Sequence, residues 1–328
     1  MIRVIFDSDG GVDDAAALWW ACTSPDVEVV AVTAVAGNVD VDQAAANLAT
    51  ILAAAGHPQV PVAVGPADPV GPTPPVRRAS FIHGTDGLGD LGLTGGAWEP
   101  APVGGPELLV ELTAARPGEL TVVATGPLSN LARALDADPG WAGRVADLVV
   151  MGGSARAGGN ARPVAEANFA NDPTAAARVA AGGWPRPPLL VGLDVTLRAT
   201  LTDREFDLLA ERRTPAAEFL AGPMAFYREM GSTFTAPGEC PCHDLVAMIT
   251  AAHPGVVSGP ELPMAVDIGG SAAWGESVVD FRALAFARRG TTPAGVGDAA
   301  DDTGATWRIG LEVDVERFRA EVRSLFGG

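Results

Sequence analysis

Short apolar runs that alternate with helix-forming segments are the feature that most limits how this 328-residue chain can fold. The apolar runs have the length and the flanking turn residues of buried strands, and they lie at residues 2–6, 28–33, 120–124, 147–151 and 189–194. Helix-like segments stand between them, for example at residues 41–55. This alternation predicts an α/β fold with a single open, mostly parallel β-sheet flanked by helices.

We expect this sheet to form one Rossmann-like domain over residues 1–328, because no linker, internal repeat or low-complexity segment divides the chain. In open sheets of this kind, ligands bind beyond the carboxyl ends of the strands. The polar clusters of this chain follow predicted strands or lie in long loops such as the Pro/Gly-rich segment 66–104, and long structureless loops are usually functional. The sequence therefore predicts one active site at the C-terminal ends of the strands.

The composition narrows the range of partners and compartments. With 22 basic and 40 acidic residues the net charge is −18, which argues against binding to nucleic acid or to an anionic membrane surface. Three cysteines cannot make a disulfide framework, so a reducing compartment is expected. We see no secretory leader, and no apolar run approaches the roughly 18 residues of a membrane span. We expect a cytoplasmic protein.

The turn D-S-D-G-G-V-D-D at residues 7–14 places four carboxylates between the end of a strand and the first turn of a helix. Asp13 and Asp14 fall where backbone N–H groups are unpaired and the helix dipole is positive. Helix capping would explain one or two of these acids, but four converging acids repel each other. A bound hard cation such as Ca2+ or Mg2+ offsets that repulsion, so we predict a metal site here.

Further polar groups follow other predicted strands. His243 and Asp244 open a helix, and the carbonyl of Thr125, at a strand end, could ligate a cation. His83 lies in the long loop. Amide and carboxylate groups of the kind that hold sugar hydroxyls gather in one polar loop, at Asn160, Glu166 and Asn168. We expect these groups to meet the acidic turn in one site.

With these residues in view, the chain resembles the nucleoside hydrolase family of the inosine–uridine preferring type. Members open with D-x-D-P-G-x-D-D, and residues 7–14 match except that Gly10 stands where proline is usual. Further matches follow in family order, namely G-N at 37–38, H-G-x-D-G at 83–87, T-G-P-L-S-N at 125–130, M-G-G at 151–153, E-A-N-F at 166–169, N-D-P at 171–173, G-L-D-V-T at 192–196 and H-D at 243–244. Each motif is moderately specific, and the ordered set is very specific.

The resemblance implies a Ca2+-dependent enzyme that hydrolyses the N-glycosidic bond of purine and/or pyrimidine ribonucleosides, giving ribose and free base. Such an enzyme would serve purine and pyrimidine salvage, and family members are commonly oligomers, so a dimer or tetramer is expected. The resemblance also implies two catalytic residues: Asp9 would be the base that activates water, and His243 would protonate the departing base.

The remaining roles are also carried over from the resemblance. The groups implied to hold Ca2+ are Asp9, Asp14, Asp244 and the carbonyl of Thr125. The residues implied to contact the nucleoside are Asp13, Asn38, Asn160, Glu166 and Asn168 at the ribose, with Met151 nearby and His83 near the base. Asp7 would hold the neighbouring site residues in place without contacting the substrate or the ion. The segments 66–81 and 203–230 would shape base recognition.

The chemistry of the reaction is consistent with these residue types. Cleavage of an N-ribosidic bond passes through an oxocarbenium-like sugar, which surrounding carboxylates stabilise. A metal ion orients the ribose diol and makes water a better nucleophile. The base leaves more easily when an acid protonates it, and histidine can donate a proton near neutral pH.

Three other interpretations fit part of the sequence. The F-D-S-D-G run at residues 6–10 resembles a haloacid-dehalogenase-like phosphatase, but that chemistry normally uses a lysine and the chain has none. A nucleoside- or ribose-binding protein without turnover would keep the pocket, although retention of both Asp9 and His243 argues against it. Zinc at Cys240, Cys242 and His243 would need a fourth ligand at an established spacing, and no second pair is present.

Overall fold

The computed structural model describes residues 1–73, 78–231, 235–236, 238–287 and 304–326. Within these residues the chain builds a nine-stranded sheet. In sheet order its strands are β11 (Ser277–Val279), β10 (Glu261–Val266), β12 (Ala305–Ile309), β6 (Leu189–Val191), β5 (Asp147–Met151), β4 (Leu120–Ala124), β1 (Ile2–Ser8), β2 (Val27–Ala34) and β3 (Val62–Val64). Neighbouring strands from β12 to β3 pair in parallel, and β10 pairs antiparallel with β12 and β11. The prediction of an open, mostly parallel sheet is confirmed.

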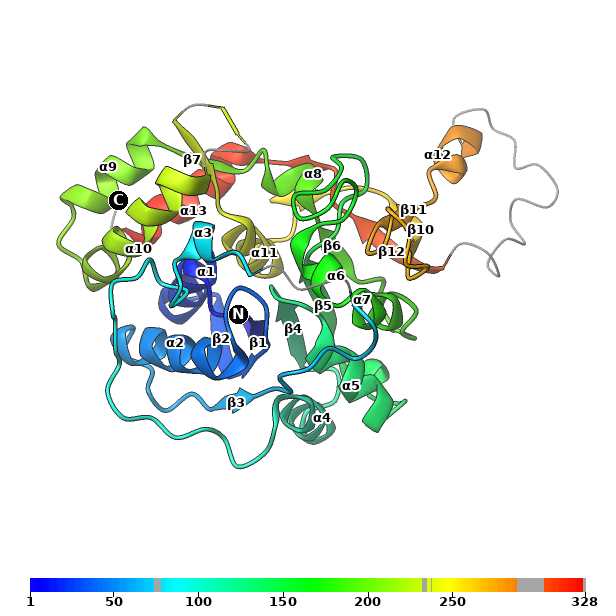
Figure 1. The fold of residues 1–328 in the computed structure, drawn as a ribbon, viewed down its shortest axis with the longest axis horizontal. Helices are drawn as coiled ribbons and strands as arrows, with labels where there is room; N and C mark the ends of the chain where they lie inside the picture. Colours follow the sequence, from blue (N-terminus) through cyan, green and yellow to red (C-terminus); the bar gives the residue numbers. More distant parts are fainter. Residues whose placement is uncertain (74–77, 232–234, 237, 288–303, 327–328) are drawn as a thin grey trace.

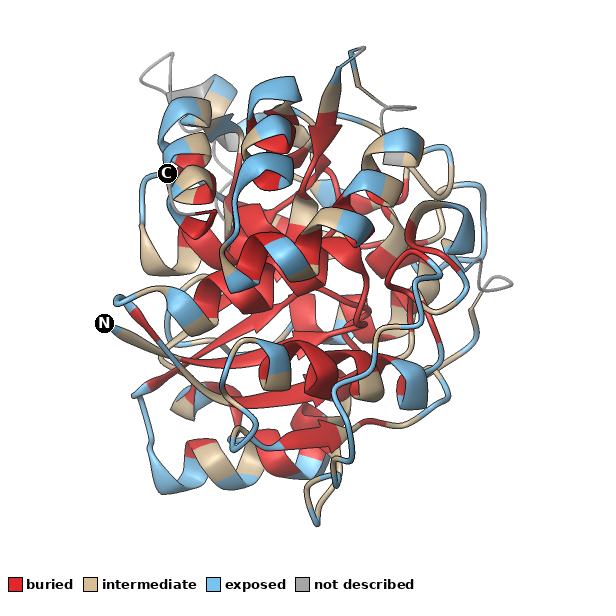
Figure 2. Ribbon diagram, turned by 90° about the vertical axis from the view of Figure 1, so that its left-hand side faces the viewer, coloured by how far each residue is buried: buried red, intermediate tan, exposed pale blue. Residues whose placement is uncertain are grey.

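Helices cover both faces of this sheet, as Figure 1 shows. In β1, Val4 and Phe6 join the core on one face, with residues of α1 (Val12–Thr23), α2 (Val41–Ala54) and α11 (His243–Ala252). Ile5, between them, joins the core on the other face, with α4 (Gly105–Ala115), α5 (Ser129–Ala137) and α7 (Pro173–Ala180). Successive side chains of a strand point to opposite faces, so a strand covered on both faces is apolar throughout. Figure 2 shows the result, buried strands between helices whose outer sides are exposed.

A second group of elements lies at one end of the molecule. It comprises α3 (Ser80–His83), β7 (Thr200–Thr202), α9 (Asp203–Glu211), α10 (Pro215–Gly231), β8 (Glu239–Pro241) and α13 (Val315–Leu325). Helix α10 contacts both α1 and α3, so it reaches the end of the sheet where the first turn lies. The short elements that complete the described chain are the 3-10 helix η1 (Ala142–Arg144), α6 (Ala167–Asn171), α8 (Leu193–Thr196), β9 (Val257–Ser258), α12 (Arg282–Ala287) and β13 (Glu312–Val313).

Short helices lie in two predicted loops, α3 in the segment 66–104 and α6 in the polar loop that carries Asn160. Two further segments differ from the expectation drawn from the sequence. The strand expected at 189–194 ends at Val191, because α8 begins at Leu193, whose backbone N–H donates to the Gly153 carbonyl over 3.0 Å. The sequence also predicts a loop over residues 236–243, but this segment contains β8, in which Cys240 lies opposite Leu201 of β7 with both side chains buried. Neither difference is visible locally, since each depends on a partner distant in sequence.

The described residues contain no helix that combines the length and apolarity needed to cross a lipid bilayer. Sheet strands are drawn from nearly the whole chain, from β1 at residue 2 to β12 at residue 309. The expectation of a single domain over residues 1–328 stays a prediction. Residues 74–77 of the long Pro/Gly-rich segment lie outside the described residues.

Candidate active site

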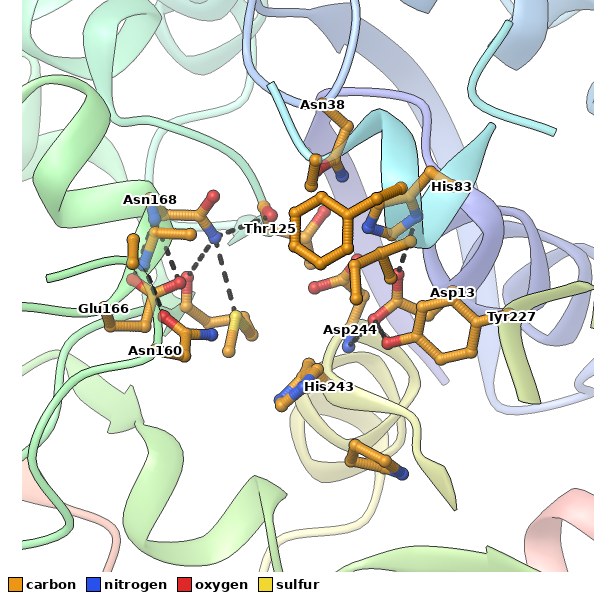
Figure 3. Close-up of a pocket in the computed structure, with 17 residues that line it drawn as sticks. Asp13, Asn38, His83, Thr125, Asn160, Glu166, Asn168, Tyr227, His243 and Asp244 are labelled. Atoms are coloured by element: carbon orange, nitrogen blue, oxygen red, sulfur yellow. Dashed lines mark hydrogen bonds and ion pairs between the residues drawn. The ribbon is translucent and has the colours of Figure 1, made fainter. Parts of the chain in front are cut away.

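One cavity opens at the C-terminal ends of the central strands, and Figure 3 shows the side chains that surround it. Most of the site residues predicted from the sequence line it, namely Asp13, Asn38, His83, Thr125, Met151, Asn160, Glu166, Asn168, His243 and Asp244. The other three, Asp7, Asp9 and Asp14, are buried behind these lining residues. The expectation that the separate motifs meet at one end of the sheet is confirmed.

The turn after β1 is held by its own acids. Gly11 is the N-cap of α1, and Asp14 Oδ2 accepts the Gly11 N–H over 2.9 Å. Asp14 Oδ1 accepts the hydroxyls of Ser8 (2.6 Å) and Thr125 (2.7 Å). Capping is therefore done by Asp14, which leaves Asp13 to face the cavity.

Gly10, the departure from the family pattern, has a conformation that proline cannot take. Its φ is +68°, whereas proline fixes φ near −65°. Its N–H donates to Ser8 Oγ over 3.1 Å, a bond for which proline has no donor. The turn of this chain is thus built around a glycine, and the hydroxyl of Ser8 links that glycine to Asp14.

Three buried acids converge where two helices begin. Asp13 and Asp14 lie in the first turn of α1 and Asp244 in the first turn of α11, and one carboxylate oxygen from each lies within 4.8 Å of the others. The backbone N–H of Asp244 also points to Asp13 Oδ2, over 3.4 Å. Burial, followed by the charges of the neighbouring aspartates, raises the pKa of Asp244 well above its usual value. The site is a candidate metal centre of buried oxygen ligands, which suit a hard cation.

This trio of acids shares Asp14 and Asp244 with the expected ligand set, but it contains Asp13 where the expected set has Asp9. Asp14 and Asp244 were expected as ligands, and Asp13 was expected at the ribose. Asp9 lies beside them: burial, then the charge of Asp14, raises its pKa. Its carboxylate accepts the backbone N–H (2.8 Å) and the side-chain amide (2.9 Å) of Asn38.

The opposite wall of the cavity carries the predicted sugar-binding groups. Glu166 caps α6 and accepts the backbone N–H groups of Gly153, Asn168 and Phe169. Burial raises the pKa of Glu166 to about 7. The Asn168 amide donates to the carbonyls of Thr125 (2.9 Å) and Met151 (3.1 Å), so it joins the ends of β4 and β5. The start of α6 therefore fixes this wall.

The two histidines of the cavity have different partners. Nδ1 of His83 accepts the backbone N–H of Val12 over 3.1 Å. Nδ1 of His243 lies 2.7 Å from the hydroxyl of Thr196. Burial lowers the pKa of both imidazoles below the usual 6.5. The two rings therefore share a cavity but are held by groups with different hydrogen-bonding capacity.

Tyr227 is the main lining residue that sequence reasoning missed. Its hydroxyl donates to Asp13 Oδ2 over 3.2 Å, and its ring centroid lies 5.3 Å from that of His83. It belongs to α10, inside the segment 203–230 expected to shape base recognition, and Phe81 and Ile82 come from the other such segment, 66–81. The segments could be predicted, but the individual residues could not. The one available signal was that Tyr227 is the only tyrosine of the chain.

Asp7 lies outside the cavity and is completely buried. Its Oδ2 accepts the hydroxyl of Thr33 (2.6 Å) and the amide of Asn130 (2.8 Å). Its other oxygen has no hydrogen-bond partner among the described residues, and burial raises the pKa of Asp7 to about 7. Asp7 thus ties β1 to β2 and α5 below the acidic turn.

A wall of carboxylates and carboxamides facing two histidines suits a hydrolase that cleaves the bond between a sugar and its leaving group. Residues 4–320 match the family model of the inosine-uridine preferring nucleoside hydrolases. The chain belongs to this family: it is an N-glycosyl hydrolase that cleaves the N-glycosidic bond of ribonucleosides.

Relatives and solved structures agree on this family. The chain is 35% identical over 252 residues to a protein of Oryza sativa subsp. japonica named probable uridine nucleosidase 1, covering 77% of each chain. It resembles the structure of a plant nucleoside hydrolase with a TM-score of 0.89 at 28% identity, covering 99% of this chain and 98% of the other. It also resembles the purine-preferring ribonucleoside hydrolase of Gardnerella vaginalis, with a TM-score of 0.85 at 31% identity and the same coverage. These findings favour the hydrolase over the phosphatase and the binding protein.

Proposed function

We propose that this nucleoside hydrolase uses Ca2+, with Asp9 as the base and His243 as the acid. The observation that carries the proposal is that one cavity brings the buried acids of α1 and α11 together with His243 and the sugar-binding wall. The acids lie on one side of the space that a ribose would fill, and the histidine reaches the same space. Hydrolysis of a nucleoside needs these two kinds of group on one substrate.

The residues present fit a calcium ion. Their ligand atoms are oxygens only, and no arginine stands among the described residues that line the cavity to balance the acids. The groups that would hold Ca2+ are Asp9, Asp14, Asp244 and the Thr125 carbonyl, with Asp13 a further oxygen donor beside them. When bound, the ion would supply positive charge that orients the ribose hydroxyls and makes water more nucleophilic.

Amino-acid side chains carry out the proton transfers and hold the ribose. Asp9 accepts the proton of the attacking water at a carboxylate oxygen, while the two donors of Asn38 keep that carboxylate in one orientation. Asn160, Glu166 and Asn168 hold the ribose, and the negative charge around it stabilises the positive charge that develops on the sugar. His243 donates a proton to the departing base.

We propose that both purine and pyrimidine ribonucleosides are substrates. The relatives support this breadth, since one is named for uridine and another is called purine-preferring. The base would meet Phe81, Ile82 and Tyr227. Their apolar surfaces can contact a purine or a pyrimidine ring without hydrogen bonds to the polar groups at its edge. The segments that carry them are the ones expected to shape base recognition.

The test is release of ribose from inosine, adenosine, uridine and cytidine, by metal-stripped protein and after Ca2+ is restored. Ca2+-dependent release is expected from all four, and the rates rank the bases. The variant Asp9→Ala is expected to lose turnover and the bound ion together, and wild-type rates in Asp9→Ala would contradict the site. If wild-type protein released no ribose while Asp9→Asn bound nucleoside normally, the chain would be a binding protein.

We also propose that the enzyme is a cytoplasmic dimer or tetramer. The resemblance to a family of oligomers supports the assembly, and the free thiols of Cys22, Cys240 and Cys242 fit a reducing compartment. Light scattering coupled to size-exclusion chromatography would measure the subunit number, and a monomer at assay concentration would contradict the proposed dimer or tetramer. Fluorescent tagging in the source cell would test the proposed cytoplasmic location.

A further inference from the structure

We infer that Thr196 is a positioning residue for the reaction, which holds the imidazole of His243 so that its Nε2 faces the departing base. The inference rests on the proposed function, because it takes His243 as the proton donor. Thr196 is completely buried and does not line the cavity, whereas His243 does. Its effect on the reaction would therefore pass through the ring that it touches.

The contact occupies one ring nitrogen and leaves the other for the substrate. The Thr196 hydroxyl lies 2.7 Å from Nδ1 of His243, which is the first residue of α11. Figure 3 shows the His243 ring at the start of that helix, beside the cavity. A ring held at Nδ1 cannot rotate about its bond to the chain without losing this contact. Nε2 is thus the nitrogen that can give a proton to a base.

The partner of His83 shows why the hydroxyl matters. A backbone N–H can only donate, so the contact of His83 with Val12 requires an unprotonated Nδ1. A hydroxyl can donate or accept, so Thr196 can keep its contact with His243 before and after the proton is given up. The hydrogen-bond partner of His243 therefore suits both forms of the ring, whereas the backbone N–H that bonds to His83 suits only the unprotonated nitrogen.

Thr196 is itself held firmly by the short helix α8. Its backbone N–H donates to the Gly192 carbonyl over 3.1 Å, and a Cβ on Gly192 would lie 2.9 Å from the Gly153 carbonyl oxygen. Asp194, in the same helix, accepts the N–H groups of Ala155 (2.6 Å) and Arg156 (2.8 Å), which begin the loop that carries Asn160. The start of the helix is therefore tied to the segment that follows β5, and the hydroxyl of Thr196 has a defined place.

The alternative is that Thr196 only stabilises the fold. Substitution would then lower every activity alike, through loss of folded protein. A role in positioning the acid predicts a different pattern, because a substrate whose leaving group needs no proton should be spared. p-Nitrophenyl β-D-ribofuranoside is such a substrate, since nitrophenolate leaves unaided, whereas the bases of inosine and adenosine need protonation.

The experiment compares three variants of the Ca2+-loaded full chain on inosine and on the nitrophenyl riboside. Thr196→Val keeps the shape and removes the hydroxyl, and Thr196→Ser keeps the hydroxyl. Thr250→Val is the matched control: Thr250 is buried in α11, but its hydroxyl bonds to the Val246 carbonyl of its own helix, 2.7 Å away. Thermal unfolding of each variant reports on the fold.

We expect Thr196→Val to lower kcat for inosine by about tenfold to a hundredfold, a part of what a general acid contributes. The rate on the nitrophenyl riboside should change by no more than about twofold to threefold. Thr196→Ser should restore most of the loss, and Thr250→Val should leave both rates near those of the wild type. This split between the two leaving groups is the result that supports the inference.

Three outcomes would overturn it. Equal losses on both substrates in Thr196→Val would show a structural role only. Unchanged rates on both would show that the hydroxyl is not needed. A wild-type protein that cleaves neither substrate would overturn the proposed function, and the inference with it, whereas an active wild type with an unaffected Thr196→Val overturns the inference alone.

Discussion

The hydroxyl of Tyr227 donates a hydrogen bond to Asp13 Oδ2 over 3.2 Å, although the two residues are 214 positions apart. This bond joins α10, which carries part of the segment 203–230 expected to shape base recognition, to the acidic turn at the start of α1. Burial, then the charge of Asp13, raises the pKa of Tyr227 well above its usual 10, so the hydroxyl remains a donor throughout the working range of pH. One side chain thus couples the base side of the cavity to the metal and ribose side.

We expect Tyr227→Phe to raise KM for all four nucleosides by about threefold to tenfold, which corresponds to the net contribution of about 1 kcal/mol of one typical hydrogen bond. The ring, and with it the packing on His83, is retained in this variant. Steady-state kinetics on the Ca2+-loaded enzyme would measure the effect. A change confined to purines or to pyrimidines would contradict a role through Asp13 and would indicate direct contact with the base.

Gly37→Ala is expected to lower kcat by about a hundredfold with the fold intact, because a group about 1 Å out of place costs that much. A Cβ at residue 37 would lie 2.0 Å from Asp9 Oδ2, so the carboxylate must move. Gly37 does not have a positive φ, so backbone strain would not explain the loss. Gly183→Ala, which meets no atom within 4 Å, is the control. A kcat of Gly37→Ala equal to that of Gly183→Ala would show that a Cβ at residue 37 does not displace the Asp9 carboxylate.

Gly10→Pro, which would restore the residue usual in the family, is expected to lower the free energy of unfolding by on the order of 3 kcal/mol. Proline cannot adopt a φ of +68°, and it removes the N–H that donates to Ser8. Ser8→Ala removes the acceptor of that bond and the hydroxyl that donates to Asp14, but it leaves the backbone free, and should cost about 2 kcal/mol. Urea denaturation would compare the three proteins. A Gly10→Pro protein as stable as the wild type would show that this turn can adopt another conformation.

Glu166 should make the metal-free protein less stable as the pH rises. Burial raises its pKa from the usual 4.5 to about 7 in the folded chain. Below about pH 4.5 the carboxyl is protonated in both states. Between pH 4.5 and 7 only the unfolded chain gains by ionising, so the free energy of unfolding falls, by at most about 3 kcal/mol from this residue.

Glu166→Gln isolates this contribution, because the other buried acids remain in both proteins. Urea denaturation with a chelator at pH 5, 6, 7 and 8 should show the wild type losing more stability than Glu166→Gln between pH 5 and 7. The two curves should run parallel above pH 7. Parallel curves across the whole range would mean that Glu166 is already ionised in the folded protein at pH 5.

Much of the fold and of the site could be predicted from local sequence. Continuous apolar runs such as that around Ile5 predict strands covered on both faces. Strands of this kind, alternating with helices, predict a parallel sheet. Acids and amides that follow such strands must gather at one end of the sheet, because parallel strands end on the same side. This is why Asp13, Asn38 and Asn168 could be expected in one cavity, although the role of each stays a prediction.

Tertiary structure decided the relationships between segments that the chain brings together only on folding. The contact of Tyr227 with Asp13 needs α10 to cross α1, and the contact of Thr196 with His243 needs α8 to end beside the start of α11. No periodicity or spacing encodes these distances. The sequence by itself determined most of the chemical groups that the site contains, since side-chain type and the position of a group directly after a strand are local. Which group bonds to which was decided by packing, because a hydrogen bond depends on tenths of an ångström between distant segments.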